Sequence, residues 1–127
     1  MGPNGLINLI KGFMNKLNKI IYLAALLEGE GCFIQDRSAR VHLAMTDKDV
    51  MEKFCSYLKD LGFEFKGTIK TRNNNKLKNP NWSVYYHFKL SSSNAIKLMK
   101  LILPYMGLRR SNKIKMLIGE YYAKKIN

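Results

Sequence analysis

The chain has 127 residues, and its 22 Lys and Arg against 9 Asp and Glu give a formal net charge of +13. This length fits one domain, and an apolar content of 46% is enough for a core, which excludes wholesale disorder and low-complexity classes. The longest apolar run, residues 20–27, is too short for a membrane-spanning helix, and no signal-peptide pattern opens the sequence. We therefore expect a soluble, non-secreted protein without a membrane partner.

The charge favours a polyanionic partner. A basic surface attracts nucleic acid or an acidic membrane, and nucleic acid is the better match for a soluble chain. The alternative is that the lysines only keep the protein soluble. The 2 cysteines, Cys32 and Cys55, form no Cys-x-x-Cys pair, so we expect reduced thiols in the cytoplasm or in an organelle matrix, of a mitochondrion or chloroplast.

The N-terminal part of the sequence divides into an appendage and a helix. Residues 1–15 are expected to lie outside a single domain that spans residues 16–127. Apolar residues then cover both sides of a helix over residues 16–28, which predicts burial on two faces. Gly29 and Gly31 are unfavourable in a helix and end it.

Two hairpins and three more helices are predicted after this helix. Period-2 alternation predicts strands over residues 32–37 and 40–45 around a turn at Ser38 and Ala39. An amphipathic helix follows over residues 48–61. A second hairpin is predicted over residues 65–72 and 82–90. The helix after it runs to about residue 103, where Pro104 breaks it, and a last helix covers residues 111–126. Helices on one side of an antiparallel sheet make an α+β fold.

The outward face of the predicted sheet has a one-sided composition. Its residues on three strands include no acid, whereas a solvated face normally mixes signs, so the face fits phosphates and base edges better than water alone. These residues are Arg40, His42, Lys66, Thr68, Lys70, Arg72, Ser83, Tyr85, His87 and Lys89. On the first strand, alternation places Ile34, Asp36 and Ser38 on this face and Arg37 opposite. All four are counted as candidate DNA contacts.

Residues 23–31, Leu-Ala-Ala-Leu-Leu-Glu-Gly-Glu-Gly, resemble the nine-residue signature of the LAGLIDADG homing endonucleases. With the strand entry at Cys32 and the break at Pro104, the resemblance covers roughly residues 18–122. It departs from the usual signature at Ala25, where Gly is common, and in having Glu at both acidic positions. The resemblance implies an αββαββα fold with a saddle-shaped antiparallel sheet, helices on one face, and cleavage of DNA.

Glu28 and Glu30 are unusual at the end of a helix. The negative end of the helix dipole disfavours carboxylates there unless a cation compensates. They point to different sides, so they are not a shared ligand pair. The resemblance assigns the metal to Glu30, with the carbonyl of Gly29 as a further ligand, and Mg²⁺ suits such oxygens, with Mn²⁺ or Ca²⁺ as substitutes in binding. The alternative is an acidic helix exit without chemistry.

The resemblance also implies a homodimer. In the family this helix packs against its counterpart, and the sequence has one such motif, so the second would come from another copy, on a roughly palindromic site. The residues assigned to this interface are Ile21, Ala24, Ala25, Glu28 and Gly29. The alternative is a buried core helix.

Asp47 and Arg109 stand where family members carry catalytic polar and basic residues. Asp47 has the alternative of a helix N-cap, and Arg109 that of a surface cation.

The sequence therefore predicts a homodimeric, Mg²⁺-dependent, site-specific endonuclease of double-stranded DNA, from a bacterial or phage host or an organelle. The alternatives are a maturase that binds host intron RNA and a DNA-binding regulator on the same fold.

Overall fold

The computed structural model describes residues 2–65, 69–71 and 85–126, and within these residues α1 (Pro3–Glu30) is the longest element. Pro3 suits its first turn, where no hydrogen-bond donor is needed. The predicted start of this helix at residue 16 is wrong, because the helix begins at Pro3 and runs unbroken through Gly12. Gly12 lowers the helix propensity of this segment by about 1 kcal/mol but does not interrupt it.

β1 (Gly31–Asp36) and β2 (Ser38–Met45) form the predicted hairpin. The turn lies at Arg37, which has a φ of 55°, and not at Ser38 and Ala39. Ala39 is a buried strand residue opposite Gln35. Alternation of buried and exposed residues located the strands correctly but placed the turn one to two residues too late.

The remaining strands complete one antiparallel sheet. α2 (Lys48–Asp60) leads to β3 (Ile69–Thr71) and β4 (Tyr85–Ser91), and the strand order is β1-β2-β4-β3. β2 lies between β1 and β4, so the first hairpin supplies both an edge and a central strand.

The chain ends in α3 (Ser92–Ile102), the short 3₁₀ helix η2 (Leu103–Tyr105) and α4 (Leu108–Ile126). Pro104 ends α3 as predicted, since it cannot continue the hydrogen bonding of a helix. α4 begins at Leu108, earlier than the predicted residue 111, so the Arg109–Arg110 pair lies in its first turn.

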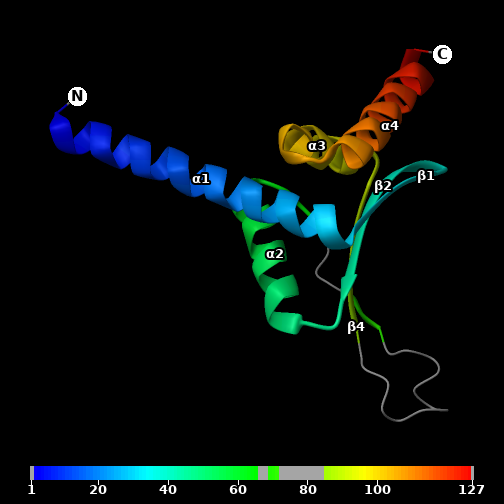
Figure 1. The fold of residues 1–127 in the computed structure, drawn as a ribbon, viewed down its shortest axis with the longest axis horizontal. Coiled ribbons are helices and arrows are strands. Elements are labelled where there is room, and N and C mark those ends of the chain that lie inside the picture. Colours follow the sequence, from blue (N-terminus) through cyan, green and yellow to red (C-terminus); the bar gives the residue numbers. More distant parts are fainter. Residues whose placement is uncertain (1, 66–68, 72–84, 127) are drawn as a thin grey trace, which may run out of the picture.

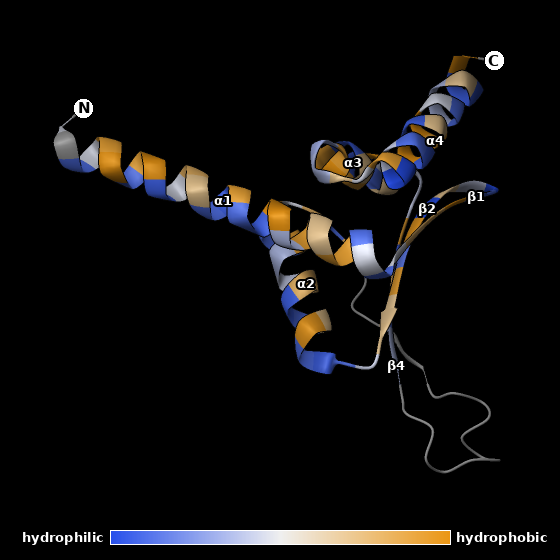
Figure 2. Ribbon diagram, viewed as in Figure 1, coloured by the Kyte–Doolittle hydropathy of each residue, from blue (hydrophilic) through white to orange (hydrophobic). Residues whose placement is uncertain are grey.

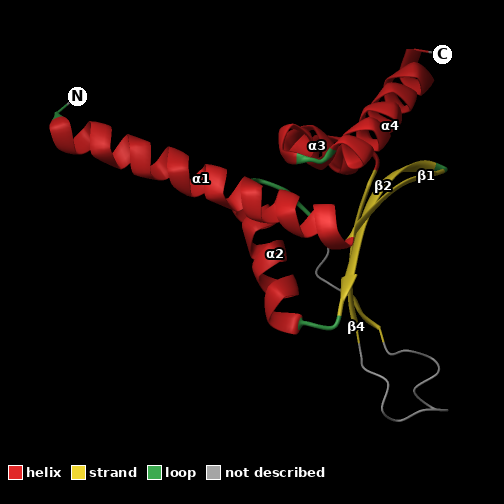
Figure 3. Cartoon of the chain, in the orientation of Figure 1, coloured by secondary structure: helices red, strands yellow, loops and turns green. Residues whose placement is uncertain are grey.

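The helices cover one face of the sheet, which is seen nearly edge-on in Figure 1, and Figure 3 shows the same two layers by element type. The core lies between the layers. Its buried residues come from both layers, as the α+β fold requires: from α1, α2, α3 and α4, and from β1, β2 and β4. Its fully buried large side chains are Phe54, Leu23, Leu27, Leu43, Met51, Leu58, Leu98, Met99, Ile102, Ile114, Leu117 and Val41. The predicted α+β class, with helices on one side of an antiparallel sheet, is confirmed. None of the helices in the described residues has the length and apolarity needed to cross a membrane.

Candidate functional site

The C-terminal end of α1 separates its two glutamates. Glu28 is half-buried, and its carboxylate accepts a hydrogen bond from the backbone N–H of Gly107, just before α4, at 3.3 Å. Glu30 is exposed, and among the described residues it has no hydrogen-bond or ion-pair partner. Glu28 therefore stabilises the fold, whereas the carboxylate of Glu30 is available to a ligand.

Arg110 joins the end of α1 to the start of α4. Its Nε donates to the carbonyl of Glu28 at 3.1 Å and its Nη1 to the carbonyl of Gly31 at 2.5 Å, and its guanidinium lies 5.6 Å from the centre of the Phe33 ring. The last carbonyls of a helix have no partner within the helix, so this side chain satisfies groups that would otherwise need water. Arg110 holds the segment that contains Glu30 in place.

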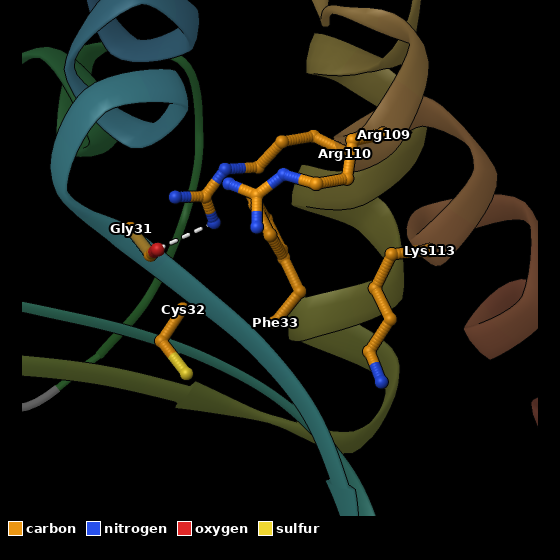
Figure 4. A pocket seen from close by; sticks show the side chains of 6 residues that line it. All are labelled: Gly31, Cys32, Phe33, Arg109, Arg110 and Lys113. Carbon is orange, nitrogen blue, oxygen red and sulfur yellow. Dashed lines mark hydrogen bonds between the residues drawn. The ribbon is translucent and has the colours of Figure 1, made fainter.

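A shallow pocket of about 230 Å³ lies beside this contact, and Figure 4 shows it from close by. Its floor is formed by Gly31, Cys32 and Phe33 at the start of β1, and its basic wall by Arg109, Arg110 and Lys113 on α4. Arg109 and Lys113 are exposed. The pocket thus places two available cations next to Gly31, the residue that follows Glu30, and a phosphate group fits such a setting.

The atoms at the end of α1 that could bind a metal are oxygens, which suit a hard cation. The Glu30 carboxylate and the backbone carbonyls of the last helical turn are oxygen ligands of the kind Mg²⁺ prefers. Within the described ranges no group of three or more His, Cys, Asp and Glu side chains could hold a metal ion. A metal at Glu30 would therefore need ligands from DNA, water or a second copy.

Asp47 is the N-cap of α2. Its Oδ1 accepts a hydrogen bond from the backbone N–H of Val50 at 3.1 Å, which satisfies one of the unpaired donors at the helix start. The structure therefore gives Asp47 a structural role, and the catalytic role predicted for it gains no support from this geometry.

The outer face of the sheet carries the predicted polar and basic side chains. The register pairs His42 with Lys89, Arg40 with Ser91, and Ala44 with His87. Tyr85, His87 and Lys89 alternate with the buried Phe88 and Leu90, so their predicted phase is confirmed. From β1, Ile34 and Asp36 pair with Arg40 and Ser38 and lie on the same face.

One acid is present on this face. Asp36 forms a 3.5 Å ion pair with Arg40, so it orients a cation and does not neutralise the whole face. Arg37 is exposed at the hairpin turn.

The centre of the outer face contains a histidine with a shifted pKa and, within the part of the chain that the structure describes, buried polar atoms without hydrogen-bond partners. The pKa of His42 is lowered, first by burial and then by the positive charges of Lys89, His87 and Arg40. The Nε2 atom of His42 and the Nε atom of Arg40 are buried without a hydrogen-bond partner among the described residues. Such atoms seldom stay unpaired in a protein, so they point to a ligand that accepts or donates hydrogen bonds.

Several predicted contacts fall outside this description. Lys66, Thr68, Arg72 and Ser83 lie outside the described residues. The backbone register pairs Lys70 with Tyr86, and Ile69 and Thr71 with His87 and Tyr85. The DNA contact predicted for Lys70 stays a prediction.

The residues predicted for the helix–helix interface divide into two groups. Ile21, Ala25 and Gly29 are exposed, four residues apart on one line of α1. Ala24 is only 1% exposed, because it packs in the chain's own core, so its assignment to an interface with a second copy is corrected. Glu28 is held by Gly107 within the same chain.

Sequence reasoning did not find Arg110, Gly107 or Lys113. The available signal in the sequence was the pair of arginines at positions 109 and 110. Which of the two faces inward can be decided only when the first residue of α4 is known. Gly107 accommodates Glu28, since a Cβ atom there would lie 2.7 Å from the Glu28 Oε1 atom.

These features agree with one family of proteins. The family model described as LAGLIDADG-like domain matches residues 18–103, and the chain belongs to this family, which is of the homing-endonuclease type and whose members bind DNA. The match contains Glu28 and Glu30 and ends before the basic residues of α4. No curated protein and no solved structure matches the chain.

Proposed function

We propose that this protein is a site-specific endonuclease of double-stranded DNA that acts as a homodimer and depends on Mg²⁺. The observation that carries the proposal is the exposed carboxylate of Glu30 at the end of the family's signature helix, one residue before a pocket that contains Arg109 and Lys113. Nuclease chemistry needs an oxygen ligand for a metal and cations for a phosphate in the same place.

DNA binding is assigned to the outer face of the sheet. Arg40 and Lys89 supply charge for phosphates, and His42, Tyr85 and His87 supply hydrogen-bonding groups for base edges. The pKa of His42 is lowered first by burial and then by the positive charges of Lys89, His87 and Arg40, and a polyanion bound on this face would counter those charges.

Each residue of the cutting site has a separate task. Glu30 and the carbonyl of Gly29 would hold the metal, which supplies an activated water and stabilises the leaving oxygen when it is bound. Arg109 and Lys113 would bind the phosphate, and Arg110 keeps the end of α1 in position. No Ser, Cys or His nucleophile is needed.

The homodimer rests on the exposed line of Ile21, Ala25 and Gly29. A Cβ atom on Gly29 would meet nothing within 4 Å in the single chain, so the end of this line, with the small residues Ala25 and Gly29, is open to a second helix. Small residues allow close approach of two helices. A second copy would bring a second Glu30 to the same duplex, one for each DNA strand.

The test compares wild-type protein with Glu30→Gln, and with Glu120→Gln as an exposed control on α4. Each is incubated in Mg²⁺ or in EDTA with source DNA that either contains or lacks intervening sequences. We expect discrete double-strand breaks with wild type and Glu120→Gln in Mg²⁺ only, and Glu30→Gln should bind DNA without cutting it.

Cleavage by Glu30→Gln would overturn the assignment of Glu30. Specific binding of DNA or intron RNA by wild type without any break would support a regulator or a maturase on the same fold.

A further inference from the structure

The N-terminal half of α1 extends away from the rest of the molecule. Figure 1 shows it projecting beyond α2, and Figure 2 shows apolar turns along this projecting part. Its apolar side chains are between 50% and 69% exposed. They are Leu6, Ile7, Leu9, Ile10, Phe13 and Met14. Six half-exposed large apolar side chains along one projecting helix form the kind of patch that marks an interaction surface.

The spacing of these residues follows a heptad. Ile7, Met14 and Ile21 are seven residues apart, and Ile10 and Leu17 lie three residues after the first two. A repeat of this kind places one apolar seam along a helix and is typical of helices that pair in a coiled coil. No charged side chain occupies these five positions, and Lys11 and Lys16 lie beside the seam.

The seam is continuous with the exposed line described above. Ile21 belongs to both, at 43% exposed. A straight helix drifts by about 20° per heptad relative to an exact seven-residue repeat. Ala24, the next seam position, has therefore turned into the chain's own core, and Ala25 and Gly29 take over the outer line.

We propose that the N-terminal half of α1 pairs with the same helix of a second copy as a parallel, in-register two-helix coil. This inference rests on the proposed function. Two Glu30 residues that act on one duplex must lie at the same end of the dimer, so both α1 helices point the same way. A two-fold axis along the pair then places Ile10 opposite Ile10 of the partner subunit.

The area available supports a second copy as the occupant. Ile21, Ala25 and Gly29 alone offer one large side chain, whereas a stable interface buries about 800 Å² on each partner. Half-exposed side chains from residues 6 to 17 add on the order of 300 Å² of apolar surface per chain. The projecting half therefore contributes a large share of what a lasting dimer needs.

The first experiment tests the register by cross-linking. Ile10→Cys is made in the full chain with Cys32→Ser, which removes the exposed native thiol, and is oxidised at low protein concentration. We expect a disulfide-linked dimer, because residue 10 faces its own copy only in a parallel pair. Asn15→Cys, exposed on another side of the same helix, should stay monomeric in a denaturing gel.

The second experiment measures self-association by sedimentation. Met14→Glu places a charge in the seam and should weaken the dimer at least about tenfold, while Asn15→Glu should not. Met14 is 56% exposed in the single chain, so the helical circular dichroism of the chain should be unchanged.

The outcomes separate this inference from the proposed function. Unchanged self-association of Met14→Glu, or no cross-link through Ile10→Cys, overturns the parallel pairing even if the protein cuts DNA. A monomeric wild type, or binding of residues 3–17 to vesicles of anionic lipid in place of self-association, overturns it as well. Conversely, a cross-linked dimer that leaves DNA intact supports the pairing and contradicts the nuclease.

Discussion

Gly31 marks the change from α1 to β1, and its hydrogen atoms face the backbone of the preceding turn. A Cβ atom there would lie 2.6 Å from the carbonyl oxygen and 2.9 Å from the Cα atom of Leu27. These neighbours are main-chain atoms that cannot rotate away. This close turn brings Glu30 to the entrance of the pocket. The signature therefore ends in glycine because a larger residue would clash with the preceding turn.

Gly31→Ala should therefore lower the free energy of unfolding by about 1–3 kcal/mol, the usual cost of overpacking. The matched control is Gly119→Ala in α4, where a Cβ atom meets nothing within 4 Å. It should raise stability by up to about 1 kcal/mol through helix propensity. Urea unfolding of both variants measures the difference, and equal stabilities would contradict the steric role of Gly31.

His42 makes stability depend on pH. Its pKa is below the ordinary 6.5, because burial and the charges of Lys89, His87 and Arg40 disfavour the protonated ring. The unfolded chain therefore takes up the proton first, so stability is independent of this group above about pH 6.5 and is lost as the pH falls below it.

We expect the free energy of unfolding to fall between pH 7 and pH 5, and to fall less in His42→Gln. Urea titrations at the two pH values measure the change. The same decrease in both proteins would show that other groups cause it.

At the scale of elements, Arg110 connects α1, β1 and α4. It binds two carbonyls from different elements, whereas its neighbour Arg109 is exposed in the same pocket. Arg110 therefore positions the end of α1, and in the proposed function Arg109 is the arginine that binds the phosphate.

Arg110→Ala should lower the free energy of unfolding by about 2 kcal/mol, since it leaves partly buried carbonyls without a charged donor. Arg109→Ala should leave stability unchanged and reduce DNA cleavage. Thermal unfolding and a cleavage assay on both variants test this, and an unstable Arg109→Ala with a stable Arg110→Ala would reverse the assignment.

The elements were predictable from the sequence where hydrophobic periodicity was strong. The helix of α2, the alternation of β4 and the break at Pro104 follow from local chemistry alone. The continuity of α1 did not, because Gly12 and a weak apolar pattern suggested a helix start at residue 16, whereas the helix runs from Pro3 through Gly12. In the site, the signature placed Glu30. The groups that hold the end of α1 at Glu28, the backbone N–H of Gly107 and the side chain of Arg110, come about eighty residues later, and only tertiary structure shows them.

At the scale of the whole molecule, the chain has a net charge of +13, and the outer face of the sheet, with Arg40 and Lys89, lies on the side away from the helices. Binding to that face should release counterions from DNA, and therefore weaken as salt rises.

Lys89→Ala should weaken DNA binding and reduce the slope of log affinity against log salt by about 1. Lys53→Ala is the control, because Lys53 lies on α2 against the Tyr22 ring, at 4.8 Å, on the helix side of the sheet. Binding isotherms at several salt concentrations measure both slopes. An equal loss of slope in the two variants would place the DNA elsewhere.

The unbroken α1 helix has a consequence for control in the cell. One helix of 28 residues, roughly 40 Å long, carries the acid at its C-terminal end and, by our proposal, the pairing seam in its N-terminal half. A dilute chain would then hold only half of a cutting centre, and the amount of complete centre would grow with the square of its concentration. A low concentration of the protein would then be enough to protect the host genome from unwanted double-strand breaks.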